Sequence, residues 1–236
     1  MKKRLLGATF EILSIFIGIT LSFFFEEYRQ DKKDAQDRKE IVQALLTDIL
    51  IYDQEMHYAI DFTQRSINRI DTALLLSSKD IELNKTQIEN LIYVIGNDHS
   101  YAPSTSPAYI GLLSSDIWQQ IPDSLRRDVF NLYEGNYGTL KVVYEKFTEY
   151  ASFMKTHFFI SLPINLYNQS NGTWRLESRD GEDSFKNVNK YLKKPEFRSA
   201  LILMRNHYNK SIRYQKEAIE SGTHIVTKLK LFLQSE

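Results

Sequence analysis

Residues 5–25 read LLGATFEILSIFIGITLSFFF, a run of apolar or small side chains with a single charge, at Glu11. A helix of this length is about 31 Å long, which matches the hydrocarbon thickness of a bilayer. A cleaved signal peptide is the alternative, but the run continues through three phenylalanines beyond its small-x-small pattern, Thr20-Leu21-Ser22. We therefore predict an uncleaved transmembrane signal anchor over residues 5–25.

The charges that flank this segment predict its orientation. Residues 1–4 form a tail with three basic side chains and no acid, whereas an acidic pair follows Phe25. The positive-inside rule counts only Lys and Arg, and residues 29–39 hold five of them, so the count alone does not decide. The basic tail favours a cytoplasmic N-terminus in a bacterial inner membrane, with residues 26–236 in the periplasm.

One side of the predicted membrane helix carries small and polar residues at steps of three or four: Gly7, Glu11, Ser14, Gly18 and Ser22. Small residues in this pattern let another helix approach closely in lipid. A carboxylate in the bilayer is costly when it faces lipid, and normally faces a partner or water. We expect a helix–helix interface here. The alternatives are that Glu11 is protonated, that it reaches the nearer membrane surface, or that it conducts protons or ions.

The helix is expected to continue beyond the membrane, because residues 26–76 contain neither Pro nor Gly. Residues 26–40 are mostly charged and are predicted to form a solvated neck. Further on, apolar side chains recur at three- and four-residue steps, typical of a coiled-coil or bundle seam: Ile41, Leu45, Ile49, Tyr52, Met56, Ala59, Ile67, Ile70 and Leu74. Residues 41–236 are therefore expected to form a helical bundle domain.

Capping and turn signals divide this bundle. Residues 162–192 lose the helical period and predict an irregular insertion, or a small hairpin around Trp174 and Leu176. The predicted fold class is all-α, an N-terminal transmembrane helix continuing into a long-helix bundle. The next helix is expected to start at Thr86, which forms a capping box with Glu89, and another to start at Ser106-Pro107. A long helix is expected from Asp123 to about residue 158. The last helix is expected to start at Pro195, with a possible bend at Ser221-Gly222.

The first and last helices of the bundle carry opposite charge. Residues 26–60 hold nine acidic and five basic side chains, whereas residues 193–236 hold four acidic and nine basic ones. Helices of opposite sign are natural neighbours, so the last helix is expected to run antiparallel along the first and back towards the membrane.

The composition excludes several kinds of chemistry. The chain has 236 residues, 30 basic and 30 acidic, and no cysteine, so it forms no disulfide or thiolate site and lacks the basic surplus of a nucleic-acid-binding protein. Its five histidines show no metal-ligand spacing, and no P-loop, G-x-G-x-x-G or G-x-S-x-G motif occurs. The sequence therefore predicts neither an enzyme nor a cofactor-binding protein.

Aromatic residues concentrate around the predicted loop between residues 96 and 122. Tyr and Trp are common on recognition surfaces. They predict a recognition cleft; the alternative is that they close one end of the bundle. The candidate residues are Tyr101, Tyr109, Trp118 and Tyr133.

Short motifs spread over most of the chain are Glu11-Ile12, Ile17-Gly18-Ile19 with Ser22, Ala108-Tyr109 with Gly111 to Ser115 and Ile121, the helical run Leu125, Val129, Leu132 and Tyr133, and Lys194 to Arg198. In these motifs the chain resembles an uncharacterised single-pass inner-membrane protein family frequent in the Bacteroidota. That family typically has Asn and Trp just after the membrane, where this chain has Phe23 to Tyr28. The resemblance implies a bacterial inner-membrane protein and supplies no catalytic residues.

The expected function is assembly rather than catalysis. The partners would be the lipid bilayer and, through the transmembrane helix, another copy of the chain or another membrane protein, with the chain as an accessory or scaffold subunit. One alternative is a periplasmic helical-bundle sensor that relays through a separate protein. Another is an oligomeric pore or proton path that uses Glu11.

Overall fold

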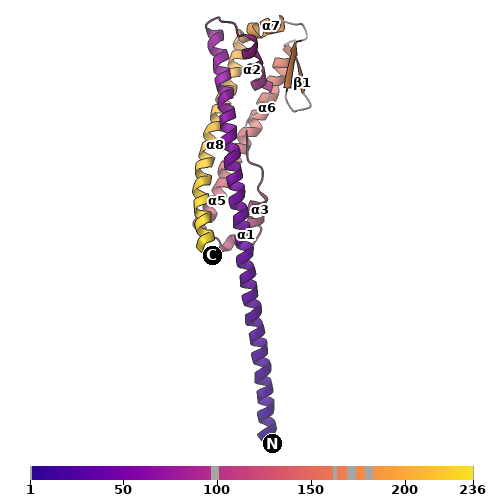
Figure 1. Cartoon of the computed structure of the whole chain (residues 1–236), viewed down its shortest axis with the longest axis vertical. Coiled ribbons are helices and arrows are strands. Elements are labelled where there is room, and N and C mark those ends of the chain that lie inside the picture. The colour runs from indigo at the N-terminus through magenta and orange to yellow at the C-terminus, as the bar shows by residue number, and fades with distance from the viewer. Residues whose placement is uncertain (1, 97–100, 162–163, 169–173, 179–182, 236) are drawn as a thin grey trace.

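A computed structural model describes the backbone of residues 2–96, 101–161, 164–168, 174–178 and 183–235, and the side chains of residues 14–96, 101–152, 156 and 187–234. The protein is all-α apart from one hairpin, as the sequence predicts (Figure 1). Its elements are α1 (Lys2–Ser78), α2 (Lys85–Gly96), α3 (Pro107–Leu113), α4 (Ile117–Gln120), α5 (Asp123–Phe130), the π-helix η1 (Asn131–Tyr137), α6 (Gly138–Ser161), β1 (Ile164–Asn168), β2 (Trp174–Ser178), α7 (Asp183–Leu192) and α8 (Pro195–Ser235).

Helix α1 is the axis of the molecule. Its 77 residues extend about 115 Å, and its N-terminal part projects alone beyond the bundle (Figure 1). Helix α8 packs antiparallel against it, so that the C-terminus lies near the point where α1 leaves the bundle. The predicted antiparallel arrangement is confirmed, and Arg205 on α8 pairs with Asp71 on α1 at 2.7 Å.

The apolar seams of α1 and α8 build two hydrophobic clusters. The cluster nearer the projecting segment joins Val42, Leu45 and Ile49 of α1 to α3, α5, η1 and the C-terminal half of α8. The far cluster joins Ile67 and Ile70 to α2, α6, α7 and the N-terminal half of α8. Because α1 and α8 contribute to both clusters, they tie the bundle together along its length.

Helix α1 ends where the sequence turns polar. Asp80 adopts a left-handed φ of 57°, and the N–H of Ile81 donates to the carbonyl of Leu76 at 3.0 Å, the long bond of a Schellman ending. Helix α2 then starts at Lys85, and its capping box lies two residues earlier than the predicted one. Asn84 and Gln87 form the box: each side-chain oxygen accepts from the other's backbone N–H, at 2.9 and 3.0 Å.

The other predicted helix starts have mixed outcomes. The cap at Ser106 is confirmed, because its hydroxyl accepts from the N–H of Tyr109 and Pro107 is the first residue of α3. The helix predicted to start at Asp123 does begin there, but Asp123 is the first residue of α5, and Pro122 occupies the capping position that the sequence predicts for Asp123. The helix that follows is interrupted by η1, whose glycine, Gly135, is a poor α-helix former.

The predicted insertion contains more regular structure than expected. Strands β1 and β2 pair antiparallel, with Leu166 opposite Leu176, so the hairpin prediction is confirmed. Helix α7 was not predicted. It fixes the insertion to the end of the bundle through Asn189, whose side-chain amide exchanges two hydrogen bonds with the backbone of Leu83, at 2.9 and 3.1 Å.

Helix α8 runs unbroken through the position where the sequence allows a bend. Gly222 instead marks a close approach between α8 and α1. A Cβ at this position would lie 3.3 Å from the Cγ2 atom of Ile49 and 3.9 Å from the hydroxyl of Tyr137. The glycine therefore sets the spacing of the two long helices.

Candidate functional site

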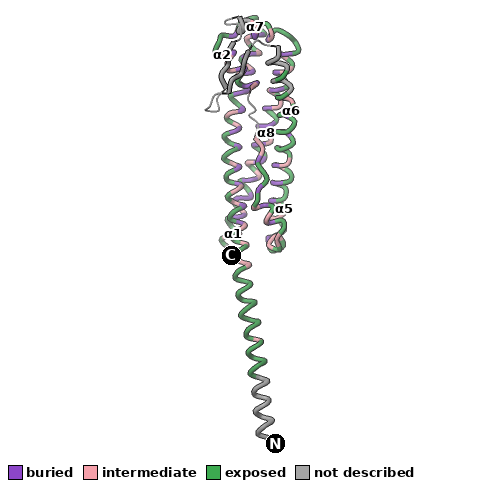
Figure 2. The backbone as a smooth tube through the Cα atoms, turned by 90° about the vertical axis from the view of Figure 1, so that its right-hand side faces the viewer, coloured by how far each residue is buried: buried purple, intermediate pink, exposed green. Residues whose placement is uncertain are grey.

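The projecting part of α1 has an apolar segment that no described part of the chain covers. None of the large apolar side chains described between residues 15 and 25 is buried, and their exposed fractions run from 49% to 72% (Figure 2). They point to all sides of the helix: Ile15, Phe16, Ile17, Ile19, Leu21, Phe23, Phe24 and Phe25. Among the residues that the structure describes, no helix combines the length and the apolar character required to cross a membrane.

The predicted helix–helix interface falls only partly on described side chains. Those of Gly7 and Glu11 lie outside them, whereas Ser14, Gly18 and Ser22 are exposed on one side of α1. A Cβ added at Gly18 would meet nothing within 4 Å. The Ser22 hydroxyl donates its hydrogen bond to the Gly18 carbonyl at 2.8 Å, so the hydroxyl group needs no acceptor on another helix.

Gly18 and Ser22 form the floor of an open hollow of about 610 Å³ on this side of α1. Larger apolar side chains border the hollow, and the Glu26 carboxylate lies at its end nearer the bundle. The lining residues are Ile15, Gly18, Ile19, Ser22, Phe23 and Glu26. A neighbouring helix could lie against this floor at short backbone distance.

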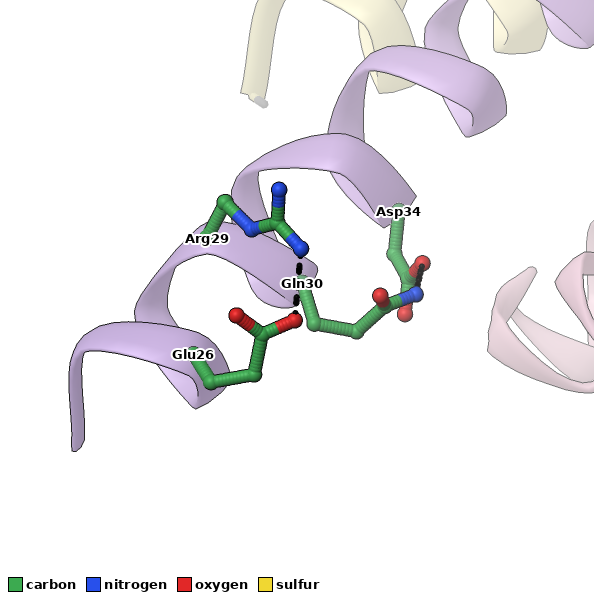
Figure 3. A network of polar contacts seen from close by, with 4 residues as sticks. All are labelled: Glu26, Arg29, Gln30 and Asp34. Atoms are coloured by element: carbon green, nitrogen blue, oxygen red, sulfur yellow. Dashed lines mark hydrogen bonds and ion pairs between the residues drawn. The ribbon is translucent and has the colours of Figure 1, made fainter. Parts of the chain in front are cut away.

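The neck between this segment and the bundle is stabilised within its own helix. Arg29 donates to Glu26 at 2.7 Å, and the amide of Gln30 donates to Asp34 at 2.8 Å (Figure 3). Such pairs three and four residues apart add a few tenths of a kcal/mol each to a helix that has no core contact. From residue 14 onwards, the first fully buried side chain of α1 is that of Val42.

Tyrosines gather in the lower part of the bundle. The rings of Tyr109 and Tyr133 stack with centroids 4.2 Å apart, Tyr133 meets Tyr137 edge-on at 5.1 Å, and Tyr137 meets Tyr52 edge-on at 5.6 Å. These rings come from α3, η1 and α1, and all four are buried. Nearby, Ser106 donates to the carboxylate of Asp48 at 2.5 Å.

The four aromatic residues of the predicted recognition cleft do not form one cleft. Tyr109 and Tyr133 are buried in the core, and Trp118 packs half-buried at its edge. Tyr101 borders a groove, and its hydroxyl donates to the carboxylate of Glu55 on α1. The stacking of Tyr109 on Tyr133 places both rings in the core, so they do not line an open cleft together with Tyr101 and Trp118.

The groove beside Tyr101 has a volume of about 680 Å³ and follows the exposed side of α1. The sequence analysis does not predict this groove. One pattern does indicate it: Ile51 and Tyr58 carry large side chains but lie off the buried seam of α1. The lining residues are Ile51, Gln54, Glu55, Tyr58, Ala59, Phe62, Tyr93 and Tyr101.

Burial governs the electrostatics of the tyrosine cluster. It raises the pKa of Tyr137 and of Tyr133 far above the ordinary value of a phenol. Neighbouring tyrosines and aspartates raise both pKa values further by smaller amounts, whereas the hydrogen bond with Ser106 lowers the pKa of Tyr133. Burial, followed by the Glu55 carboxylate, does the same to the pKa of Tyr101. The hydroxyls of Tyr101, Tyr133 and Tyr137 therefore stay protonated near neutral pH.

The Tyr137 hydroxyl is buried without a hydrogen-bond partner among the described residues, whereas that of Tyr52 donates to the carbonyl of Ser104 at 3.0 Å. We expect Tyr137→Phe to leave the free energy of unfolding unchanged or to raise it by up to about 1 kcal/mol. Tyr52→Phe should lower it by about 1 kcal/mol. Urea unfolding of both variants checks the pair, and equal losses would contradict the assignment.

The raised tyrosine pKa values predict alkaline sensitivity. In the unfolded chain these phenols ionise near pH 10, whereas in the fold Tyr133 and Tyr137 ionise only well above it. Their contribution to stability is complete below pH 10 and is lost as the pH rises towards the folded pKa. The loss is at most about 1.4 kcal/mol per pH unit for each group. Unfolding measured from pH 8 to 11.5 should be steeper in the wild type than in Tyr137→Phe.

Within the described side chains, no group of three or more His, Asp or Glu residues could hold a metal ion.

Comparison with models of protein families, with curated proteins and with solved structures finds no significant match.

Proposed function

We propose that this protein is a single-pass membrane protein that acts by assembly rather than by catalysis, either as a homo-oligomer or as an accessory subunit of a membrane complex. The observation that carries this is the exposed apolar surface of α1 over residues 15–25. A helix that is apolar on all sides is stable only where something buries it. Full burial of a large apolar side chain contributes about 1.5 to 3 kcal/mol, so these side chains together favour lipid over water by more than about 10 kcal/mol.

The sequence of residues 5–25 supplies the span, with residues 1–4 in the cytoplasm and the bundle in the periplasm of a bacterial inner membrane. The neck supports this placement. Residues 26–40 are charged and hydrated, so they suit the layer between the lipid and the folded domain. The bundle would then stand about 20 Å from the membrane.

Assembly is proposed to occur through the side of α1 that carries Gly7, Glu11, Ser14, Gly18 and Ser22. The open floor at Gly18 allows close helix approach. A partner would also remove Glu11 from lipid, where a carboxylate is unfavourable by several kcal/mol. Tight packing and relief of this burial cost are the two forces that favour association.

Cysteine cross-linking in native membranes tests the interface, because the chain contains no cysteine of its own. Ser22→Cys lies on the proposed side, and Thr20→Cys lies about 160° away on the same helix. The two residues are similar, since both hydroxyls bond to a carbonyl of the preceding turn. We expect at least tenfold more cross-linked product from Ser22→Cys. Equal yields from the two variants would remove the specific interface.

A sensor is the second candidate, favoured by the groove beside Tyr101. This groove lies on the same continuous helix that leads to the membrane, so a bound molecule could shift α1. A sensor predicts that the Ser22→Cys cross-linking yield changes when periplasmic metabolites are added to membranes. Constitutive assembly predicts a constant yield.

A further inference from the structure

The groove beside Tyr101 combines aromatic rings with one carboxylate. Of the described residues that line it, Glu55 alone is charged. Its volume of about 680 Å³ lies within the range of pockets that bind small molecules, about 300 to 1,000 Å³. The groove therefore has the size of a ligand site and a single point of charge. Its four aromatic residues are Tyr58 and Phe62 of α1, Tyr93 of α2, and Tyr101.

The α1 residues that line the groove recur at intervals of three and four, the spacing of a single helix face. This face borders the core at Ala59, which is buried, and turns outward at Tyr58, which is 71% exposed. Phe62 is half-buried and lies against Tyr93 of α2, with ring centroids 6.3 Å apart. The groove thus follows about three turns of α1, and one end of it lies against α2.

The Glu55 carboxylate at the other end keeps acceptor capacity for a ligand. The hydroxyl of Tyr101 donates to one of its oxygens. An ionised carboxylate accepts about four hydrogen bonds, so most of this capacity stays open. None of the ion pairs between described side chains includes Glu55. The carboxylate is therefore positioned by Tyr101 and accessible to a cation.

Two arginines give the groove an electrostatic direction. The guanidinium of Arg65 lies 5.5 Å from the ring centroid of Phe62, and that of Arg69 lies 5.6 Å from the ring centroid of Tyr93. Both distances are those of cation–π contacts. Arg65 follows Glu55 by ten residues, about 15 Å along α1. The end near α2 thus already has the protein's own cations on its rings, whereas the Glu55 end carries the negative charge.

We infer that this groove binds an amphipathic organic cation, an ammonium group joined to an apolar body. The ammonium group lies at the Glu55 carboxylate, beside the rings of Tyr58 and Tyr101, because aromatic rings attract cations. The apolar body extends along α1 towards Phe62, seven residues or about 10 Å away. The inference does not require the proposed assembly, and it names the class of molecule that the sensor alternative would detect.

Calorimetric titration of the full chain in phosphatidylcholine nanodiscs tests the inference, with empty nanodiscs as the blank. The probes are phenylbutylammonium, the neutral phenylbutanol and the anionic phenylbutyrate, which share one apolar body. We expect one phenylbutylammonium to bind per chain, at least tenfold more tightly than either other probe. Such binding also shows that the choline headgroups, present in excess, do not fill the groove. No saturable binding of phenylbutylammonium, or binding of another probe within threefold of it, would overturn the inference.

Glu55→Gln removes the charge but keeps the side-chain length and an acceptor for the Tyr101 hydroxyl. We expect phenylbutylammonium to bind about tenfold more weakly, because a charged hydrogen bond is lost, while the affinity for phenylbutanol stays unchanged. Glu145→Gln, the same change at an exposed position on α6, is the matched control and should leave both affinities unchanged. Equal losses in the two variants, or no loss in Glu55→Gln, would contradict the assigned cation position.

The ring of Tyr58 is tested by a pair of substitutions. Tyr58→Leu keeps an apolar side chain but removes the aromatic ring, so the affinity for phenylbutylammonium should fall about three- to fivefold. Tyr58→Phe keeps the ring and should bind like the wild type. Because Tyr58 is exposed, both variants should fold. A loss in Tyr58→Leu that is equal for phenylbutylammonium and phenylbutanol would show apolar contact alone and reject a cation beside this ring.

Cross-linking of Ser22→Cys with saturating phenylbutylammonium separates this inference from the proposed function. Binding of phenylbutylammonium with a constant cross-linking yield would retain the groove as a ligand site and reject relay along α1. Cross-linked product from Ser22→Cys without binding of phenylbutylammonium would retain assembly and reject the ligand site.

Discussion

Asn189→Ala is expected to lower the free energy of unfolding by about 2 to 4 kcal/mol. The Asn189 side chain is buried, and its amide donates to the Leu83 carbonyl while its oxygen accepts from the Leu83 N–H. Removing it leaves both backbone groups buried without these partners, and each such group costs about 1 to 3 kcal/mol. Urea unfolding followed by circular dichroism measures the loss.

Two further variants define the cause. Asn189→Asp keeps an acceptor for the Leu83 N–H but loses the donor to its carbonyl, so a loss at least as large as half that of alanine is expected. Asn206→Ala, at an exposed position on α8, should change stability by less than about 0.5 kcal/mol. A small effect of Asn189→Ala, comparable to that of Asn206→Ala, would show that α7 does not hold the end of the bundle.

Deleting residues 1–25 is expected to move the protein from the membrane fraction to the soluble fraction with its bundle intact. The buried core of α1 begins at Val42, and the described residues of the projecting segment make no contribution to either hydrophobic cluster. The melting temperature of the truncated protein should therefore lie within a few degrees of that of the full chain in detergent. Ultracentrifugation of lysates and thermal melts measure both effects.

Deleting residues 26–36 instead is the matched control. Eleven residues are close to three helical turns, so α1 keeps its rotational phase while the neck becomes shorter. This variant should remain in the membrane fraction. If the protein without residues 1–25 still sediments with membranes, or unfolds, the apolar segment is not the anchor.

The sequence predicts well whatever depends on helical period. The apolar steps of α1 and α8 place Leu45, Ile49 and Met56 in the core, where the structure has them. The opposite charges of the two helices predict their antiparallel packing. In both cases the information lies within a window of a few turns, where spacing alone fixes the face on which a side chain lies.

The tyrosine cluster shows where this reasoning stops. The high local density of Tyr and Trp predicts a recognition cleft. In the structure Tyr109 of α3 stacks on Tyr133 of η1. The sequence around either residue does not predict that contact, because the two lie on different helices. The π-helix was equally hidden, since Gly135 only weakens an α-helix locally and does not specify a wider turn.

The amino-acid order alone determined the helical class, the apolar segment at residues 5–25, the charged neck, and the side of α1 to which each residue belongs. Only the tertiary structure decided that Gly222 would meet Ile49, that Asn189 would complete the backbone bonds of Leu83, and that Tyr93 and Tyr101 would wall a groove beside α1. The reason is that helix phase is a property of neighbouring residues. Contacts between distant segments depend on the register in which α7 and α8 dock on the rest of the chain, and that register is set by the packing of the whole core.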